Sequence, residues 1–184
     1  MISYRDGTPA DANALNRLAR ETFIETFGHL YAPHDLGAFL ERHTPQAYRE
    51  DLSDPAFAIR FAQDGDELIA FAKLGPPSLP FEPTGHALEL RQFYVHKPWH
   101  GTAVARTLMD WVLATARARA ADELWLSVFV DNHRARRFYE RYGFRFVAPY
   151  AFMVGNHQDE DHILKLDLHR TQDVVPAKAG TTMR

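Results

Sequence analysis

Residues 93–144 read FYVHKPWHGTAVARTLMDWVLATARARAADELWLSVFVDNHRARRFYERYGF, and this stretch decides the fold. An apolar strand runs into a turn of small residues that opens an amphipathic helix, and a second strand and a second helix follow. Two strands joined by a helix predict a right-handed crossover and a locally parallel strand pair. The sequence therefore predicts a mixed α/β domain with a parallel pair at its centre.

The rest of the chain adds strands and helices on both sides of this unit. Proline at position 9 after Thr8 predicts a helix start, and Thr44-Pro45 interrupts the helical stretch 34–53, which forms one or two shorter helices. The sequence Asp64-Gly65-Asp66-Glu67 predicts a hairpin turn. The expected strands are 2–5, 57–63, 68–74, 87–95, 123–130, 144–149 and 161–168, and the expected helices are 8–27, 34–53 (one or two), 101–120 and 132–142.

Two segments are predicted to lack regular structure. Prolines and glycines exclude a helix or strand at residues 75–85, which form either a lid over a site or a surface loop. The end of the chain, 171–184, has few large apolar residues and is expected to be flexible. One domain over residues 1–170 follows, since 184 residues suffice for one core and are too few for two.

Composition and charge limit the class of protein. The chain has 46% hydrophobic residues, 24% charged residues and a formal net charge of -3, which argues against a general nucleic-acid binder. Residues 95–150 carry nine Lys and Arg against five Asp and Glu, so the rest of the chain is acidic. No cysteine, apolar span or signal-peptide pattern is present, and we expect a cytoplasmic protein that does not bind a membrane.

The turn His100-Gly101-Thr102-Ala103-Val104-Ala105 predicts an anion site. The first amides of a helix lack backbone partners and carry positive partial charge. Small residues let a diphosphate approach that backbone closely. A basic region around the turn and an acidic remainder of the chain fit an anionic cofactor and a cationic second substrate, although solvated surface charge explains the same pattern.

Two motifs resemble the Gcn5-related N-acetyltransferase superfamily over roughly residues 2–168. The family's pyrophosphate loop, Gln/Arg-x-x-Gly-x-Gly/Ala, matches residues 100–105, with His100 in place of Gln or Arg and Ala103 in place of Gly. Its later signature, Asn-x-x-Ala-x-x-Phe-Tyr-x-x-x-Gly-Phe, matches residues 132–144 without a gap. The resemblance implies a mostly antiparallel sheet of six to seven strands, with a splayed parallel pair and flanking helices.

The resemblance also implies acetyl-coenzyme A as cosubstrate, bound where the parallel strands splay apart at Val95 and Val128. Asn132 would bind the pantetheine amides, a role compatible with capping the following helix. The implied cofactor-binding residues are Phe93, Val95, His100, Gly101, Thr102, Ala103, Val104, Ala105, Asn132, Ala135, Phe138 and Arg141. No metal is implied, and the spacing of His96 and His100 does not favour one.

Two residues are candidates for catalysis. Tyr139 is protonated at neutral pH and can donate a proton to the departing thiolate, although a packed helix aromatic is the alternative. An alkylammonium must lose a proton before it attacks. Glu89, on the strand before the loop, can accept that proton through a water, or can be a charge-pair partner or solvent-facing residue.

Stretches 21–27, 88–95, 152–155 and 159–161 resemble the bacterial PaiA-type polyamine N-acetyltransferases. The implied function is transfer of an acetyl group to a small primary amine, with a polyamine as one candidate. Glu21 or Glu25 would then line an acidic acceptor cleft, or else lie on a solvated helix face. The alternative function is a non-catalytic coenzyme-A-binding module on the same fold, and a homodimer is compatible with either.

Overall fold

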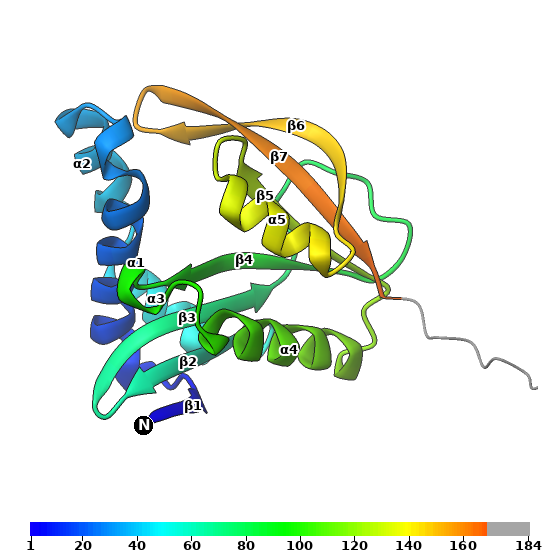
Figure 1. The fold of residues 1–184 in the computed structure, drawn as a ribbon, viewed down its shortest axis with the longest axis horizontal. Coiled ribbons are helices and arrows are strands. Elements are labelled where there is room, and N and C mark those ends of the chain that lie inside the picture. The colour runs from blue at the N-terminus through cyan, green and yellow to red at the C-terminus, as the bar shows by residue number, and fades with distance from the viewer. Residues whose placement is uncertain (169–184) are drawn as a thin grey trace, which may run out of the picture.

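Seven strands form one mixed sheet in the computed structural model, which describes residues 1–168 (Figure 1). The strand order is β1-β2-β3-β4-β5-β7-β6; β4 and β5 run parallel, and the other neighbouring pairs are antiparallel. The strands are β1 (Ile2–Asp6), β2 (Ala58–Asp64), β3 (Glu67–Gly75), β4 (Ala87–Val95), β5 (Glu123–Phe129), β6 (Arg145–Val154) and β7 (His157–Asp167). The expected sheet of six to seven strands with one parallel pair is confirmed. The tail expected at 171–184 lies outside the described residues.

Helices cover both faces of the sheet (Figure 1). On one face, α4 and α5 pack over a core that includes Leu108, Met109, Leu126 and Phe144. On the other face, α1 to α3 bury Leu15, Phe23, Leu40 and Tyr48 in two smaller clusters. The helices are α1 (Ala12–Phe27), α2 (Pro33–Glu41), α3 (Pro45–Ser53), α4 (Ala103–Ala118) and α5 (His133–Arg141).

Helix starts follow the capping residues of the sequence. The Thr8 amide and hydroxyl both donate to Asp11, at 2.8 and 2.9 Å, just before α1. Thr44, Thr102 and Asn132 each accept a backbone amide from the first turn of α3, α4 and α5. These side chains satisfy amides that a helix start leaves unpaired, and so fix where each helix begins.

The parallel pair separates after three residues. β4 pairs with β5 at Ala87–Glu123, Leu88–Leu124 and Glu89–Trp125, and no further pairing joins them in the described chain. The register of β4 against β3 shifts at Arg91, so that strand bends there. Beyond Glu89, β4 and β5 therefore face each other as two unpaired strand edges.

The β6–β7 hairpin is longer than the sequence analysis expected. Residues 150–160 extend both strands past the expected limits to a turn at Gly155 and Asn156. The Asn156 amide donates to Asp35 of α2 at 2.8 Å, and Gly155 has a φ of +58° at a position where an added Cβ would lie 2.6 Å from Asp35. The hairpin tip thus docks on α2 (Figure 1) and encloses space between the sheet and the first helices.

The proline-rich segment is a strap on the paired end of β4 and β5. The Ser78 and Leu79 amides donate to Glu89, and Thr84 donates to Glu123. The Phe81 ring stacks on Trp125 with centroids 3.7 Å apart. Of the two expectations for residues 75–85, the lid is wrong, because buried contacts hold the segment at the closed end of the splay. Among the described residues no helix is long and apolar enough to cross a membrane.

Candidate active site

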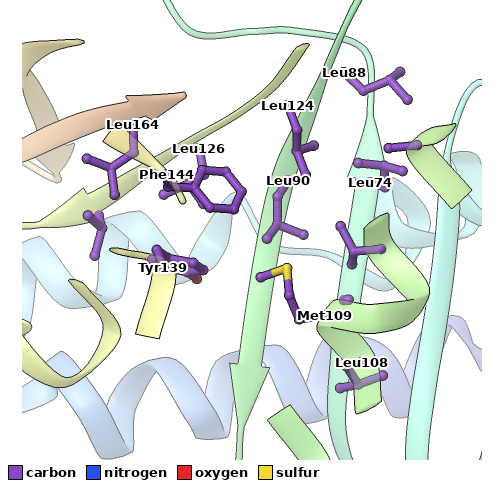
Figure 2. Packing of buried hydrophobic residues seen from close by; sticks show 14 of the residues in the cluster. Leu74, Leu88, Leu90, Leu108, Met109, Leu124, Leu126, Tyr139, Phe144 and Leu164 are labelled. Carbon is purple, nitrogen blue, oxygen red and sulfur yellow. The ribbon is translucent and has the colours of Figure 1, made fainter. Parts of the chain in front are cut away.

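A cavity of about 870 Å³ opens where β4 and β5 separate. It runs from the start of α4, between the strand edges, to the space enclosed by α1, α2 and the β6–β7 hairpin. Its inner wall is the main core, where Figure 2 shows Tyr139 beside Phe144 and across from Leu90 of β4. One cavity therefore joins the anion-binding turn to the other face of the sheet.

Most of the expected site residues line this cavity. They are Phe93, Val95, His100, Gly101, Thr102, Ala103, Ala105, Asn132, Ala135, Phe138, Tyr139 and Arg141. Val104 does not: its side chain lies in the core, 2% exposed, and its amide donates to the Thr102 hydroxyl at 3.3 Å. The side chain of Val104 therefore forms no part of the cavity wall, and a role of Val104 in cofactor binding stays a prediction.

The first turn of α4 has the features of an anion site. Gly101 has a φ of +77°, which turns the chain into the helix at a conformation that glycine adopts without strain. Ala103 begins the helix, and its φ is not positive, so its methyl group is tolerated. The amides of Ala103 and Ala105 have no acceptor among the hydrogen bonds of residues 1–168. These donors suit phosphate oxygens.

His100 is held by two protein groups. Its Nε2–H donates to the Val95 carbonyl at 2.7 Å, and its Nδ1 accepts a hydrogen bond from Arg134. Burial lowers the pKa of the imidazole, and the charge of Arg134 lowers it further, so the ring is neutral at pH 7. Arg134 thereby brings a guanidinium to the cavity beside the turn. The sequence does not single out Arg134 among the arginines of α5, because each of them can equally lie on a solvated helix face.

Tyr139 is buried, with 7% of its surface exposed, and it lines the cavity. Its ring packs edge-on against Phe93, Phe138 and Phe144. Burial raises the pKa of the hydroxyl well above its ordinary value, so the proton is retained at neutral pH. The hydroxyl makes no hydrogen bond with another described residue. It is available to a ligand.

Asn132 caps α5. Its Oδ1 accepts the Ala135 amide at 3.2 Å, and its side chain also lines the cavity. The amide nitrogen of the side chain has no hydrogen-bond acceptor among residues 1–168. The cap and a ligand contact are therefore compatible.

Glu89 does not line the cavity. Its carboxylate, 5% exposed, accepts the amides of Ser78 and Leu79 and lies 3.5 Å from Arg91 Nε. Glu89 sits in the short parallel pair, before the strands separate, and the strap covers it. Of its expected roles, the charge-pair partner agrees with these contacts, the solvent-facing residue is wrong, and the base stays a prediction that no contact of Glu89 supports.

The acids expected in an acceptor cleft, Glu21 and Glu25, also lie outside the cavity. Glu25 and Glu21 lie beside His96, at 3.0 and 3.5 Å from its ring nitrogens. The acids that do line it within residues 1–168 are Asp159 and Asp161 of β7. The sequence carries a signal for them, since acids two residues apart lie on one face of a strand, but the strand expected there begins only at 161, whereas β7 begins at His157.

Within residues 1–168 no group of three or more His, Cys, Asp or Glu side chains is arranged to hold a metal ion.

Comparisons with known proteins agree with this geometry. The model of the Acetyltransferase (GNAT) family matches residues 14–144. An uncharacterised N-acetyltransferase of Mycobacterium tuberculosis is 31% identical over 159 residues, which cover 86% of this chain and 98% of the relative. An uncharacterised N-acetyltransferase of Lactobacillus delbrueckii is 25% identical, over 80% and 87% of the two chains.

Solved structures share the fold at low identity. The PaiA N-acetyltransferase of Thermoplasma acidophilum, solved with coenzyme A, superposes with a TM-score of 0.73 at 18% identity, over 91% of this chain and 99% of that one. NAA60 of Arabidopsis thaliana, solved with acetyl-CoA, gives a TM-score of 0.70 at 16% identity, over 91% and 98% of the chains. With its family match, its relatives and its splayed sheet, the chain belongs to the GNAT acetyltransferase family.

Proposed function

We propose that the chain is an N-acetyltransferase that moves the acetyl group of acetyl-CoA to a small primary amine by direct attack in a ternary complex. A polyamine is one candidate acceptor. The observation that carries the proposal is the continuity of the cavity, which joins unpaired amides at the start of α4 to the Tyr139 hydroxyl and to two buried acids.

The α4 end of the cavity suits the diphosphate. Ala103 and Ala105 offer backbone amides, and Arg134 offers a guanidinium that can donate two parallel hydrogen bonds to a phosphate. Farther in, the unpaired edge of β4 at Phe93 and Val95 can pair with an extended amide chain as another strand would. Together with the Asn132 side chain, these groups fit the pantetheine arm of acetyl-CoA.

Tyr139 lies where the thioester would end. A buried hydroxyl that keeps its proton can donate it to the sulfur as the carbon–sulfur bond breaks. Fixed donors along the β4 edge also stabilise charge that develops on the carbonyl oxygen. The chain thus supplies both the binding groups and an acid.

Three features of the site favour an enzyme over a coenzyme-A-binding module. The sequence departures that favour the module are His100 and Ala103. His100 positions Arg134, and Ala103 is helical, so neither departure removes a binding group. The retained Tyr139 has no evident use in a module.

The first experiment measures thiol release from acetyl-CoA with a panel of primary amines, including polyamines. We expect amine-dependent release with at least one acceptor. Tight binding of acetyl-CoA without release, across the panel, would favour the module.

The Tyr139→Phe variant then tests the acid. We expect a fall in kcat of about 100-fold or more, with coenzyme A binding unchanged by calorimetry. Tyr150→Phe is the matched control, because Tyr150 packs against the cluster that contains Trp125 and does not line the cavity. An unchanged kcat in Tyr139→Phe would reject the acid role.

A further inference from the structure

The end of the cavity beyond Tyr139 holds acidic groups that the proposed coenzyme site does not use. Asp159 and Asp161 lie on the same face of β7, each 6% exposed, and both line the cavity. Two residues apart on a strand, their side chains are about 7 Å from each other. Buried carboxylates at this depth need donors or cations as partners.

Asp159 has such partners. The Tyr31 hydroxyl donates to its Oδ2, and His157 Nε2 lies 3.2 Å from its Oδ1. Burial raises the pKa of Tyr31, and the hydrogen bond to Asp159 raises it further, so Tyr31 stays a donor. These contacts make Asp159 a fixed part of the wall.

Asp161 differs from Asp159, because among the described residues its carboxylate has too few hydrogen-bond donors and no cation as partner. The Ser127 hydroxyl is the donor that faces it, whereas a carboxylate accepts about four hydrogen bonds. None of the ion pairs among residues 1–168 includes Asp161. The titratable groups near it are Asp159 on its own strand, Tyr31 after α1, Tyr94 on β4, and Tyr150, its paired residue on β6.

Tyr94, Asp161 and Tyr139, the proposed proton donor, line the same cavity. Burial raises the pKa of the Tyr94 hydroxyl, and Tyr48, Tyr139 and Asp161 raise it further. Burial and the charge of Asp159 also raise the pKa of Asp161, to about 6, against the Ser127 hydrogen bond. An under-partnered acid therefore lies in the same cavity as the Tyr139 hydroxyl.

Aromatic side chains surround this end of the cavity. Phe23 stacks on Phe39 with centroids 4.5 Å apart, Phe39 meets Phe152 edge-on at 5.8 Å, and Phe27 lies 5.2 Å from Phe23. All four line the cavity. Such a wall takes an apolar carbon stem and also attracts a cation through the ring faces.

We propose that Asp161 binds and deprotonates the incoming ammonium, while the phenylalanine wall holds the apolar stem that carries it. This inference rests on the proposed acetyl transfer. One ammonium proton passes to the Asp161 carboxylate, and the freed lone pair forms the new carbon–nitrogen bond at the thioester carbonyl. The carbon–sulfur bond then breaks and the sulfur takes the Tyr139 proton. A second nitrogen proton restores Tyr139, and Asp161 releases its proton to solvent.

The test compares Asp161→Asn with the wild type across pH, using an alkylamine and an arylamine as acceptors. The arylamine nitrogen is already unprotonated at pH 7 and needs no base. For the wild type with the alkylamine we expect kcat/KM to rise with pH through about 6 and then level. In Asp161→Asn we expect a loss of about 100-fold at pH 7, recovered progressively at higher pH, and a loss below about fivefold with the arylamine.

Glu160→Gln is the matched control, because Glu160 is exposed on the opposite face of β7 and does not line the cavity. Acetyl-CoA binding by calorimetry checks that Asp161→Asn folds. An alkylamine kcat/KM within threefold of wild type, or equal losses with both acceptors, would overturn the role of Asp161 and leave the acetyl transfer standing. A wild type that binds acetyl-CoA but releases no thiol with any amine would overturn both.

Discussion

His100 and Arg134 act as a pair at the start of α4. The family resemblance puts Gln or Arg at position 100, and here a neutral imidazole accepts a hydrogen bond from the Arg134 guanidinium instead. The positive charge is thus supplied from α5 instead of from the loop. Neither residue alone predicts this, because it depends on the two helix starts facing each other across the cavity.

The Arg134→Ala variant tests the pair. We expect KM for acetyl-CoA to rise about tenfold, near 1.5 kcal/mol, since the side chain is partly exposed and its interaction is screened. We expect kcat at saturation to stay unchanged. Steady-state kinetics measure both constants. Arg137→Ala is the control, because Arg137 is exposed and does not line the cavity. Equal KM values in the two variants would contradict the pairing.

Asp161 also has a consequence for stability. Its folded-state pKa of about 6 lies above the ordinary value of 3.8, so the folded protein holds this proton more tightly than the unfolded chain. The stabilisation is present below about pH 4 and is lost as pH rises through about 6. Ionising Asp161 in the folded state therefore opposes folding at neutral pH.

We expect Asp161→Asn to be more stable than wild type at pH 8 by about 1 to 3 kcal/mol, and equal to it near pH 4. Thermal unfolding at the two pH values measures the difference. A lower melting temperature for the variant at pH 8 would show that the carboxylate is well solvated or paired in the fold.

Among the elements, the strap over residues 75–85 explains why Glu89 does not line the cavity. Its amides fill the lone pairs of Glu89, and Phe81 covers the adjacent Trp125. The strap thus closes the paired end of β4 and β5, and the cavity opens only beyond it. Sequence alone shows prolines here but not which carboxylate the intervening amides reach.

The Glu89→Gln variant tests this structural role. Replacing one oxygen by an NH₂ group sets a donor against the Ser78 or Leu79 amide, and we expect a loss of about 1 to 3 kcal/mol in the free energy of unfolding. Denaturant titration measures it. Activity per folded molecule and its pH profile should match the wild type. A native stability with a tenfold lower kcat would restore Glu89 as a catalytic candidate.

The elements with strong local signals were predicted well. Thr8-Pro9, Thr44-Pro45 and the turn at Asp64-Gly65 mark boundaries by side-chain capping and backbone conformation, which act over a few residues. The β6–β7 hairpin was predicted too short. Polar residues 156–160 do not alternate with apolar ones, and the hairpin is fixed instead by Asn156 and Gly155 docking on Asp35 of α2.

In the candidate site, too, the residues of local motifs were predicted and the residues positioned by long-range strand pairing were not. The motif residues on β4, α4 and α5 line the cavity, because each motif is local to one turn and its helix. The acids that line it were missed, because Asp159 and Asp161 are brought to the cavity by a long-range pairing of β7 with β5. Glu21 and Glu25 lie on α1 but point to His96.

Across the whole molecule, the cavity separates a group of hydrogen-bond donors for phosphate from a pair of buried acids. His100, Arg134 and the α4 amides lie at one end, and Asp159 and Asp161 lie at the other, with Tyr139 in between. This arrangement suits an anionic donor and a cationic acceptor that enter from opposite faces of the sheet. The homodimer stays a prediction, which sedimentation at micromolar concentration tests.

The central claim is that the diphosphate of acetyl-CoA binds at the start of α4. The most direct test is to measure acetyl-CoA binding by the Ala103→Glu variant with calorimetry. An acid in the first turn favours the helix dipole, so the fold is retained, while its charge and bulk oppose a diphosphate at that spot. We predict a loss of about 100-fold, near 3 kcal/mol, and no loss for Ala114→Glu, which places the same charge on an exposed position of α4. Wild-type affinity in Ala103→Glu would mean that the phosphates bind elsewhere, and would contradict the account.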